Sequence, residues 1–130
     1  MIPRYSFNIY IYIFCAGTCP NDWISIGDTC FSPPRKTHEW KGTGDCDSNC
    51  DAVEKVCTDV GATLATKEET HAWLDNGGDR LGMMLGLTST MNGNMHWFTQ
   101  ELGDDYGWHR GCCDQTNRFF VCAKALGPGQ

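Results

Sequence analysis

Clustered positive charge is what this 130-residue chain most clearly lacks. Its 10 Lys and Arg residues are scattered and are outnumbered by 16 Asp and Glu residues, which leaves a formal net charge of -6. Because nucleic-acid phosphates are bound by gathered Lys and Arg side chains, this balance argues against a nucleic-acid partner. The chain also has no Asn-x-Ser/Thr sequon, so N-glycosylation is not expected.

The short motifs of common catalytic centres are absent as well. The chain contains neither Gly-x-Ser-x-Gly nor His-Glu-x-x-His, and an oxidised domain offers no free thiol as a nucleophile. Its cysteines include a C-x3-C pair and an adjacent Cys-Cys pair rather than the paired C-x2-C knuckles of a structural zinc site. We therefore expect a binding module and not an enzyme, with no metal ligands or cofactor.

No apolar run is long enough to predict a membrane span, but the first residues predict a secretory signal. Residues 1–18 carry one charge, Arg4, followed by an apolar stretch from Phe7 to Ala16 and then small residues. Cleavage after Gly17 or Thr18 fits this pattern; the alternatives are an N-terminal anchor or an ordinary strand. Loss of Arg4 takes the formal charge from -6 to -7. The predicted location is extracellular.

Cysteine is abundant, and removal of the signal makes the count even. Of the 9 cysteines, Cys15 lies in the predicted signal, and the remaining set fits four disulfides. A small exported domain gains stability from such bonds because its own core is modest. Spacing alone does not choose the partners. The set is Cys19, Cys30, Cys46, Cys50, Cys57, Cys112, Cys113 and Cys122.

The first half of the chain predicts a hairpin followed by two helices. "CPNDWISIGDTCF" has apolar residues on both sides of a Gly-Asp turn, which is typical of a hairpin. A short strand is expected at Thr37–Trp40, and the Gly- and Asp-rich stretch after it reads as an insertion loop. Apolar spacing predicts a helix that begins near Ser48 and ends before Gly61. A second helix is predicted between the Thr66/Glu69 capping box and the Asn-Gly pair at 76–77.

The second half predicts short strands separated by polar loops. The expected strands are Met83–Leu87, Met95–Thr99 and Phe119–Ala123, with an Asn-Gly turn between the first two. His96 and Trp97 should lie on opposite faces of their strand, and we expect His96 to be a lone, exposed and inert side chain. Trp23, Trp40 and Trp73 are most simply core residues. Residues 126–130 are expected to form a flexible tail.

In this order, several segments resemble the long form of the C-type lectin-like domain. "CPNDWISIGDTCF" is similar to the N-terminal hairpin of that family, and "VCTDVGATLATKEETHAWL" to the run from the first helix into the second. "MLGL", "HWFT" and "FFVCAK" resemble its later strands. The resemblance spans Cys19 to Lys124 and implies one α+β domain at residues 19–125, with two helices and small antiparallel sheets.

The resemblance also implies part of the disulfide pattern. It pairs Cys19 with Cys30, and Cys57 with Cys122. Cys46 and Cys50 would then bond to Cys112 and Cys113 in an order that the sequence leaves open. A bond between the adjacent residues 112 and 113 would strain the peptide and is disfavoured.

The family's calcium-dependent sugar site is not matched here. Neither its Glu-Pro-Asn or Gln-Pro-Asp triplet nor its Trp-Asn-Asp strand occurs, so no calcium ligands are assigned. The remaining candidate surface is the loop "ELGDDYGWHRG", where an aromatic face and hydroxyl-binding acids could meet a sugar or a protein. Trp108 and Tyr106 could instead be core residues and the acids a solvated turn, and two adjacent acids could bind a cation weakly. The candidate residues are Glu101, Asp104, Asp105, Tyr106, Trp108 and His109.

These expectations leave two functions open. The first is carbohydrate or glycoconjugate recognition without the usual calcium geometry, as in innate defence. The second is protein binding or a structural role, as in a venom component, a receptor ligand or an extracellular-matrix protein. A shallow polar groove beside Trp108 would favour sugar, whereas a broad apolar patch would favour a protein partner. The sequence does not indicate an oligomeric state.

Overall fold

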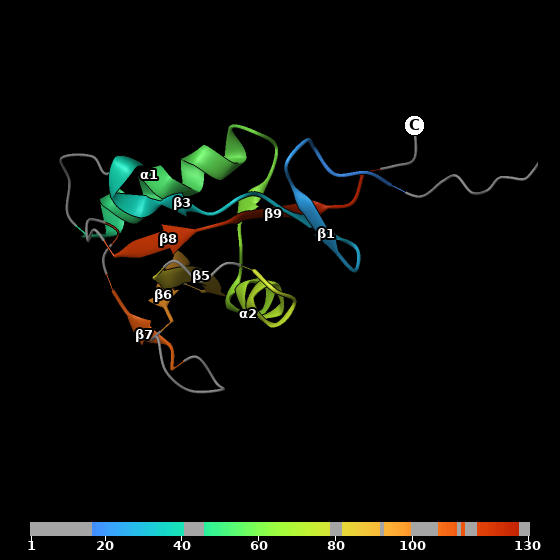
Figure 1. The fold of residues 1–130 in the computed structure, drawn as a ribbon. Coiled ribbons are helices and arrows are strands. Elements are labelled where there is room, and N and C mark those ends of the chain that lie inside the picture. The colour runs from blue at the N-terminus through green and yellow to red at the C-terminus, as the bar shows by residue number, and fades with distance from the viewer. Residues whose placement is uncertain are drawn as a thin grey trace, which may run out of the picture.

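The computed structural model describes residues 17–40, 46–78, 82–91, 93–99, 107–111, 113 and 117–127. The predicted signal segment lies outside these residues, apart from its last two positions, and so do Cys15, Cys112 and residues 128–130. Across the described part the chain is a mixed α+β structure with two α-helices and two small sheets (Figure 1). No helix among the described residues is long and apolar enough to cross a membrane.

Four strands form the first sheet, in the spatial order β1-β2-β9-β4. Strands β1 (Ile24–Ile26) and β2 (Thr29–Phe31) make the predicted N-terminal hairpin, whose turn contains Gly27 at a φ of 60°. β2 pairs antiparallel with β9 (Cys122–Ala125), which pairs in turn with β4 (Thr63–Leu64). The sheet therefore joins the two ends of the domain.

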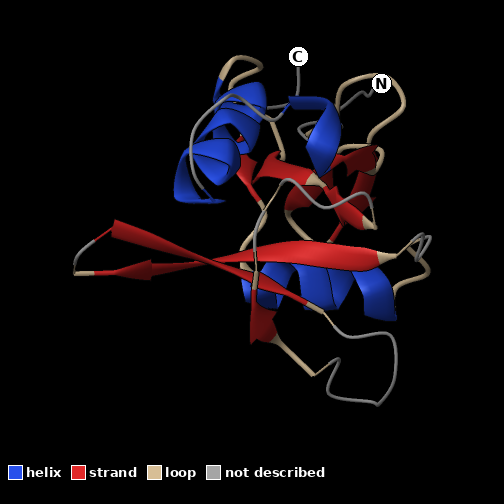
Figure 2. Ribbon diagram, turned by 90° about the vertical axis from the view of Figure 1, so that its left-hand side faces the viewer, coloured by secondary structure: helices blue, strands red, loops and turns tan. Residues whose placement is uncertain are grey.

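Five strands form the second sheet, in the order β3-β8-β5-β6-β7. Its centre is the long hairpin of β5 (Met83–Thr90) and β6 (Gly93–Phe98), which extends past the helices on one side (Figure 2). The edge strands are β3 (Arg35–Lys36) and β7 (His109–Arg110). Strand β8 (Arg118–Phe120) runs parallel to β5, so this sheet is not wholly antiparallel as the resemblance implied.

The two helices cover opposite sides of the sheets (Figure 1). Helix α1 (Cys46–Thr58) and helix α2 (Lys67–Asp75) lie close to the ranges that the sequence predicts. The capping box at the start of α2 is present: the Thr66 hydroxyl accepts from the Glu69 amide at 3.0 Å, and the Glu69 carboxylate accepts from the Thr66 amide at 2.9 Å. These bonds satisfy amides that the first turn of a helix leaves free.

The apolar core has two clusters, and successive residues of one segment enter them alternately. Phe120 and Cys122 belong to the cluster that also contains α1 residues, whereas Phe119, Val121 and Ala123 belong to the cluster around Trp73 of α2. Side chains of an extended chain alternate between faces, and both faces are covered here. This explains why "FFVCA" is a continuous apolar run.

Two predicted strands need correction. Thr37–Trp40 is a 3-10 helix, and the strand of that region is the shorter β3 just before it. The hydroxyl of Thr37 donates to the carbonyl of Arg118 at 3.2 Å, which holds the segment by a side-chain bond. The predicted strand Phe119–Ala123 is divided at Val121 between β8 and β9, which belong to different sheets. Local alternation cannot reveal a change of partner.

Three disulfides connect described residues: Cys19–Cys30, Cys50–Cys113 and Cys57–Cys122. The first and third are the pairs that the resemblance implied. The second joins α1 to the segment before β8 and sets the order that the sequence left open for Cys50. At the predicted tail, the amides of Leu126 and Gly127 donate to the carbonyls of Asp28 at 2.8 Å and Thr18 at 3.4 Å.

Candidate functional site

Only part of the predicted binding loop can be placed. Glu101, Asp104, Asp105 and Tyr106 lie outside the described residues, whereas Trp108 and His109 are described and half-buried. His109 pairs in register with the core residue Phe98, and its Nδ1 lies 3.0 Å from the carbonyl oxygen of Arg110. Trp108 packs on the opposite face, over β5, so the structure does not bring these two side chains together.

Trp108 lies directly over a glycine of the long hairpin. A β-carbon built on Gly86 would stand 2.7 Å from two ring carbons of Trp108 and 2.9 Å from the α-carbon of Lys67. Any side chain at this position would therefore displace the indole. A glycine inside a strand often marks such a close approach, and "MLGL" carried this signal in the sequence.

The ammonium group of Lys67 lies between two indoles. Its Nζ is 4.7 Å from the ring centroid of Trp97 and 5.5 Å from that of Trp108. The guanidinium of Arg110, paired in register with Trp97, is 5.9 Å from the Trp97 centroid. Cations over indole faces are attracted by the ring quadrupole. The first residue of α2 is thereby fixed against β6 and against Trp108 beside β7.

Beside this contact the surface is hollowed. A cavity of about 220 Å³ is lined by Lys67, Glu68, His71 and Trp108. The three helix residues supply a cation, a carboxylate and an imidazole, and the indole supplies an apolar wall. Sequence reasoning selected Trp108 but not its α2 neighbours, because residues of the second helix and of the late loop are about 40 positions apart in the chain.

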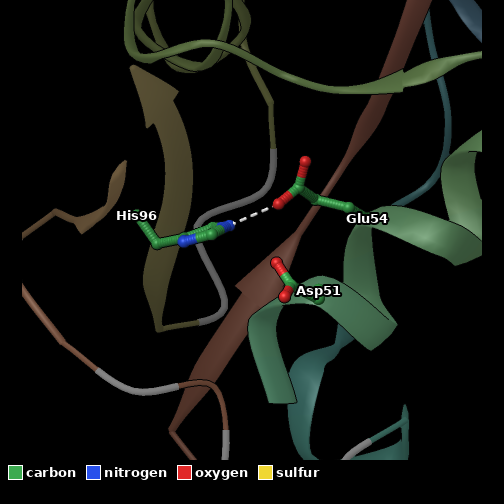
Figure 3. A group of neighbouring side chains, drawn as sticks. All are labelled: Asp51, Glu54 and His96. Carbon is green, nitrogen blue, oxygen red and sulfur yellow. Dashed lines mark hydrogen bonds and ion pairs between the residues drawn. The ribbon is translucent and has the colours of Figure 1, made fainter. Parts of the chain in front are cut away.

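A different polar cluster lies on the α1 side of the hairpin. Figure 3 shows Asp51 and Glu54 of α1 directed towards His96 of β6. The Nε2 atom of His96 lies 2.7 Å from Oε2 of Glu54, and Oε1 of Glu54 accepts a hydrogen bond from the side-chain amide of Asn94 at 2.8 Å. The Glu54 carboxylate is thus held at both oxygens by two residues of β6.

The structure corrects the prediction for His96. Its side chain is 4 % exposed and paired with Glu54, so it is neither lone nor exposed. His96 and Trp97 do lie on opposite faces of β6: the first meets α1, and the second meets Lys67 of α2. The partner in α1 is 42 positions away in the chain, which local alternation cannot detect.

The environment of Glu54 favours its charged form. The hydrogen bond with His96 is the main cause that lowers its pKa below the ordinary value of 4.5. Desolvation acts in the opposite direction, and the charge of His96 and the bond from Asn94 lower the pKa further. The carboxylate is therefore ionised at neutral pH.

This pKa predicts a contribution to stability that is lost in acid. As the pH falls through the lowered pKa, the unfolded chain binds more protons than the folded one, so the free energy of unfolding decreases. In a chelating buffer we expect Glu54→Gln to lower that free energy by about 1.5–3 kcal/mol at neutral pH, the range for hydrogen bonds to charged groups. The difference in free energy of unfolding between the unmodified chain and the variant should be full above pH 4.5 and should decrease below it.

Chemical denaturation of the unmodified chain and of Glu54→Gln at several pH values measures this difference in stability. Lys55→Gln is a suitable control. Lys55 lies in the same helix as Glu54, and its exposed ion pair with Asp59 should contribute little to stability. A difference of constant size down to strongly acidic pH would contradict the assignment.

No protein-family model matches this chain, and no curated protein matches it either.

Proposed function

We propose that this chain is a secreted C-type lectin-like recognition module that binds carbohydrate without calcium. The single observation that carries the proposal is the hollow formed by Lys67, Glu68, His71 and Trp108. It is supported by the resemblance to the lectin-like family and by the two disulfides that the resemblance implied, one in the N-terminal hairpin and one between α1 and β9. An extracellular location, a role in innate defence and the absence of enzymatic activity are parts of the same proposal.

The chemistry of the hollow suits one sugar unit. The indole of Trp108 offers an apolar wall for the C–H face of a pyranose, and the three polar side chains offer donors and an acceptor for its hydroxyls. Its volume, about 220 Å³, is below the roughly 300 Å³ at which sites for drug-sized ligands begin. We therefore expect recognition of a terminal monosaccharide rather than of a long chain.

Calcium is not required in this proposal. Among the described residues that line the hollow, Glu68 supplies the one carboxylate. A calcium ion needs about 6–8 oxygen ligands, and one exposed carboxylate cannot gather them. Bound sugar would instead be oriented by Lys67, whose Nζ is already positioned by the two indoles.

A second function, protein binding, is favoured by a different surface. A larger cavity of about 330 Å³ lies between the N-terminal hairpin and α1, and its lining includes Trp23, Pro33, Val56 and Val60. Val60, at the rim of this cavity, is 52 % exposed. This surface is the more apolar of the two, and a protein partner would bind there rather than at Trp108.

A glycan array of the oxidised full chain, with calcium and then with a chelator, tests the proposal. We expect binding in both buffers, and we expect Trp108→Ala to weaken it by about tenfold, which corresponds to roughly 1.4 kcal/mol. Trp23→Ala is the matched control, because Trp23 is also half-buried with a lysine, Lys124, 5.3 Å from its ring.

The outcomes separate the two functions. Binding that disappears in the chelator would contradict the calcium-free site. Binding lost equally in both tryptophan variants would contradict its location. No binding in either buffer would overturn the carbohydrate proposal and favour a protein partner at the Trp23 surface.

A further inference from the structure

From the geometry of Asp51, Glu54 and His96 we infer a site for a divalent transition metal, specifically Zn²⁺. One potential ligand atom from each residue lies within 4.8 Å of the other two (Figure 3). The sequence predicted no metal ligands, because these residues belong to a helix and a strand that are distant in the chain. The inference does not depend on the proposed carbohydrate site, which lies on the other face of the hairpin.

Rigid elements present the three side chains. Asp51 and Glu54 are three residues apart, which places them on one face of α1. His96 reaches this face from β6, which is hydrogen-bonded to both β5 and β7. The Cys50–Cys113 disulfide adjoins Asp51 and ties this part of α1 to the segment before β8. Ligands on such elements need little ordering when a metal binds.

The interatomic distances are compatible with zinc after a small adjustment. Zn–N and Zn–O bonds of about 2.0–2.2 Å in a tetrahedron separate the donor atoms by roughly 3.3 Å. The Glu54–His96 contact of 2.7 Å would therefore open by about half an ångström, and the exposed Asp51 side chain would move inward. Asn94 donates to the other Glu54 oxygen and would hold the carboxylate in place as an outer-shell partner.

The donor set selects zinc over the hard cations. Ca²⁺ and Mg²⁺ prefer six or more oxygen ligands, whereas an imidazole nitrogen with two carboxylates suits a four-coordinate transition ion. Two carboxylates also balance the charge of a dication. The His96 side chain is more than nine-tenths buried, so a metal bound to it would be partly shielded from solvent by the protein.

The fourth coordination position has access to solvent. Glu54 and Asn94 both line a cavity of about 280 Å³, together with Thr58, Thr66 and Ser89. Glu54 is the one proposed ligand that lines this cavity, and the exposed side of the cluster is that of Asp51. The ion and a water molecule that completes the tetrahedron would therefore enter from the side of Asp51. Three protein ligands with one open position is the usual arrangement of an accessible zinc site.

Isothermal titration calorimetry with ZnCl₂ tests the inference directly. The protein is the oxidised full chain with any remaining thiol alkylated, so that cysteine cannot bind the metal. We expect one Zn²⁺ per chain, no heat with CaCl₂, and an affinity at least about tenfold lower in Asp51→Asn. The Asp51 side chain is exposed and makes no hydrogen bond to another described side chain, so this variant should fold.

Two variants serve as controls. One removes a single carboxylate elsewhere on the surface, and the other removes the histidine of a second histidine–carboxylate pair. Asp28→Asn removes an exposed carboxylate in the N-terminal turn, and His71→Gln removes the imidazole that lies 3.5 Å from Asp75 on α2. Both should bind zinc like the unmodified chain. The inference is overturned if the unmodified chain binds no zinc at about 100 μM, where a Kd of about 1 μM would be visible. It is also overturned if Asp51→Asn binds unchanged, or if His71→Gln alone abolishes binding.

Discussion

Replacement of Cys57 and Cys122 by alanine is expected to lower the free energy of unfolding by about 4 kcal/mol. The bond joins residues separated by 65 positions, so it removes a large part of the conformational freedom of the unfolded chain. It also connects the last turns of α1 to the start of β9, the strand that pairs with both β2 and β4. For a domain of this size, a loss of 4 kcal/mol is a large share of the total stability.

Denaturant unfolding followed by tryptophan fluorescence measures this loss. The control is the Cys19/Cys30 double alanine variant, whose bond spans a separation of only 11. Its shorter loop predicts a cost of about 3 kcal/mol on the same chain-entropy model. A Cys19/Cys30 variant that is less stable than the Cys57/Cys122 variant would show that loop length does not determine the order.

Features encoded by neighbouring residues were predictable from the sequence. The N-terminal hairpin follows from apolar residues around a Gly-Asp turn, and α2 begins at the residue that its capping box indicates. Both signals act over fewer than ten residues or so, which is the range that pattern reasoning covers. Mixed α+β structure with two helices and disulfides agrees with the expectation, while the lectin-like topology stays a proposal.

Features that depend on distant partners could not be predicted. Val121 ends one strand because its carbonyl accepts from the Ala65 amide at 3.1 Å, and nothing near Val121 in the sequence indicates this bond. His96 is buried because Glu54 of α1 meets it, and the Trp108 hollow exists because α2 begins beside β5, where Thr66 bridges to Leu87. Each case requires knowledge of which elements pack together.

The position of Phe120 leads to the second large expected effect. Phe120→Ala should lower the free energy of unfolding by about 3–5 kcal/mol, because its ring is fully buried and its removal leaves a cavity. Phe120 belongs to the cluster that contains Val53 of α1 and Leu85 of β5, so a void there weakens packing between helix and sheet. Met91→Ala, at a fully exposed position of the hairpin tip, should change stability by less than about 0.5 kcal/mol.

Combining Phe120→Ala with the Cys57/Cys122 replacement separates packing from loop closure. Both disulfide residues belong to the same buried cluster as Phe120, so the effects should not simply add. The part of the disulfide's effect that acts on the unfolded chain should add to the loss from Phe120→Ala. The part that comes from packing of the two cysteines in the shared cluster is lost in both parent variants, so the triple variant should lose somewhat less than the sum. Denaturant unfolding of the two parent variants and the triple variant measures this coupling. We expect a coupling of at least about 0.5 kcal/mol, because the three residues share one packed environment; strictly additive losses would contradict it.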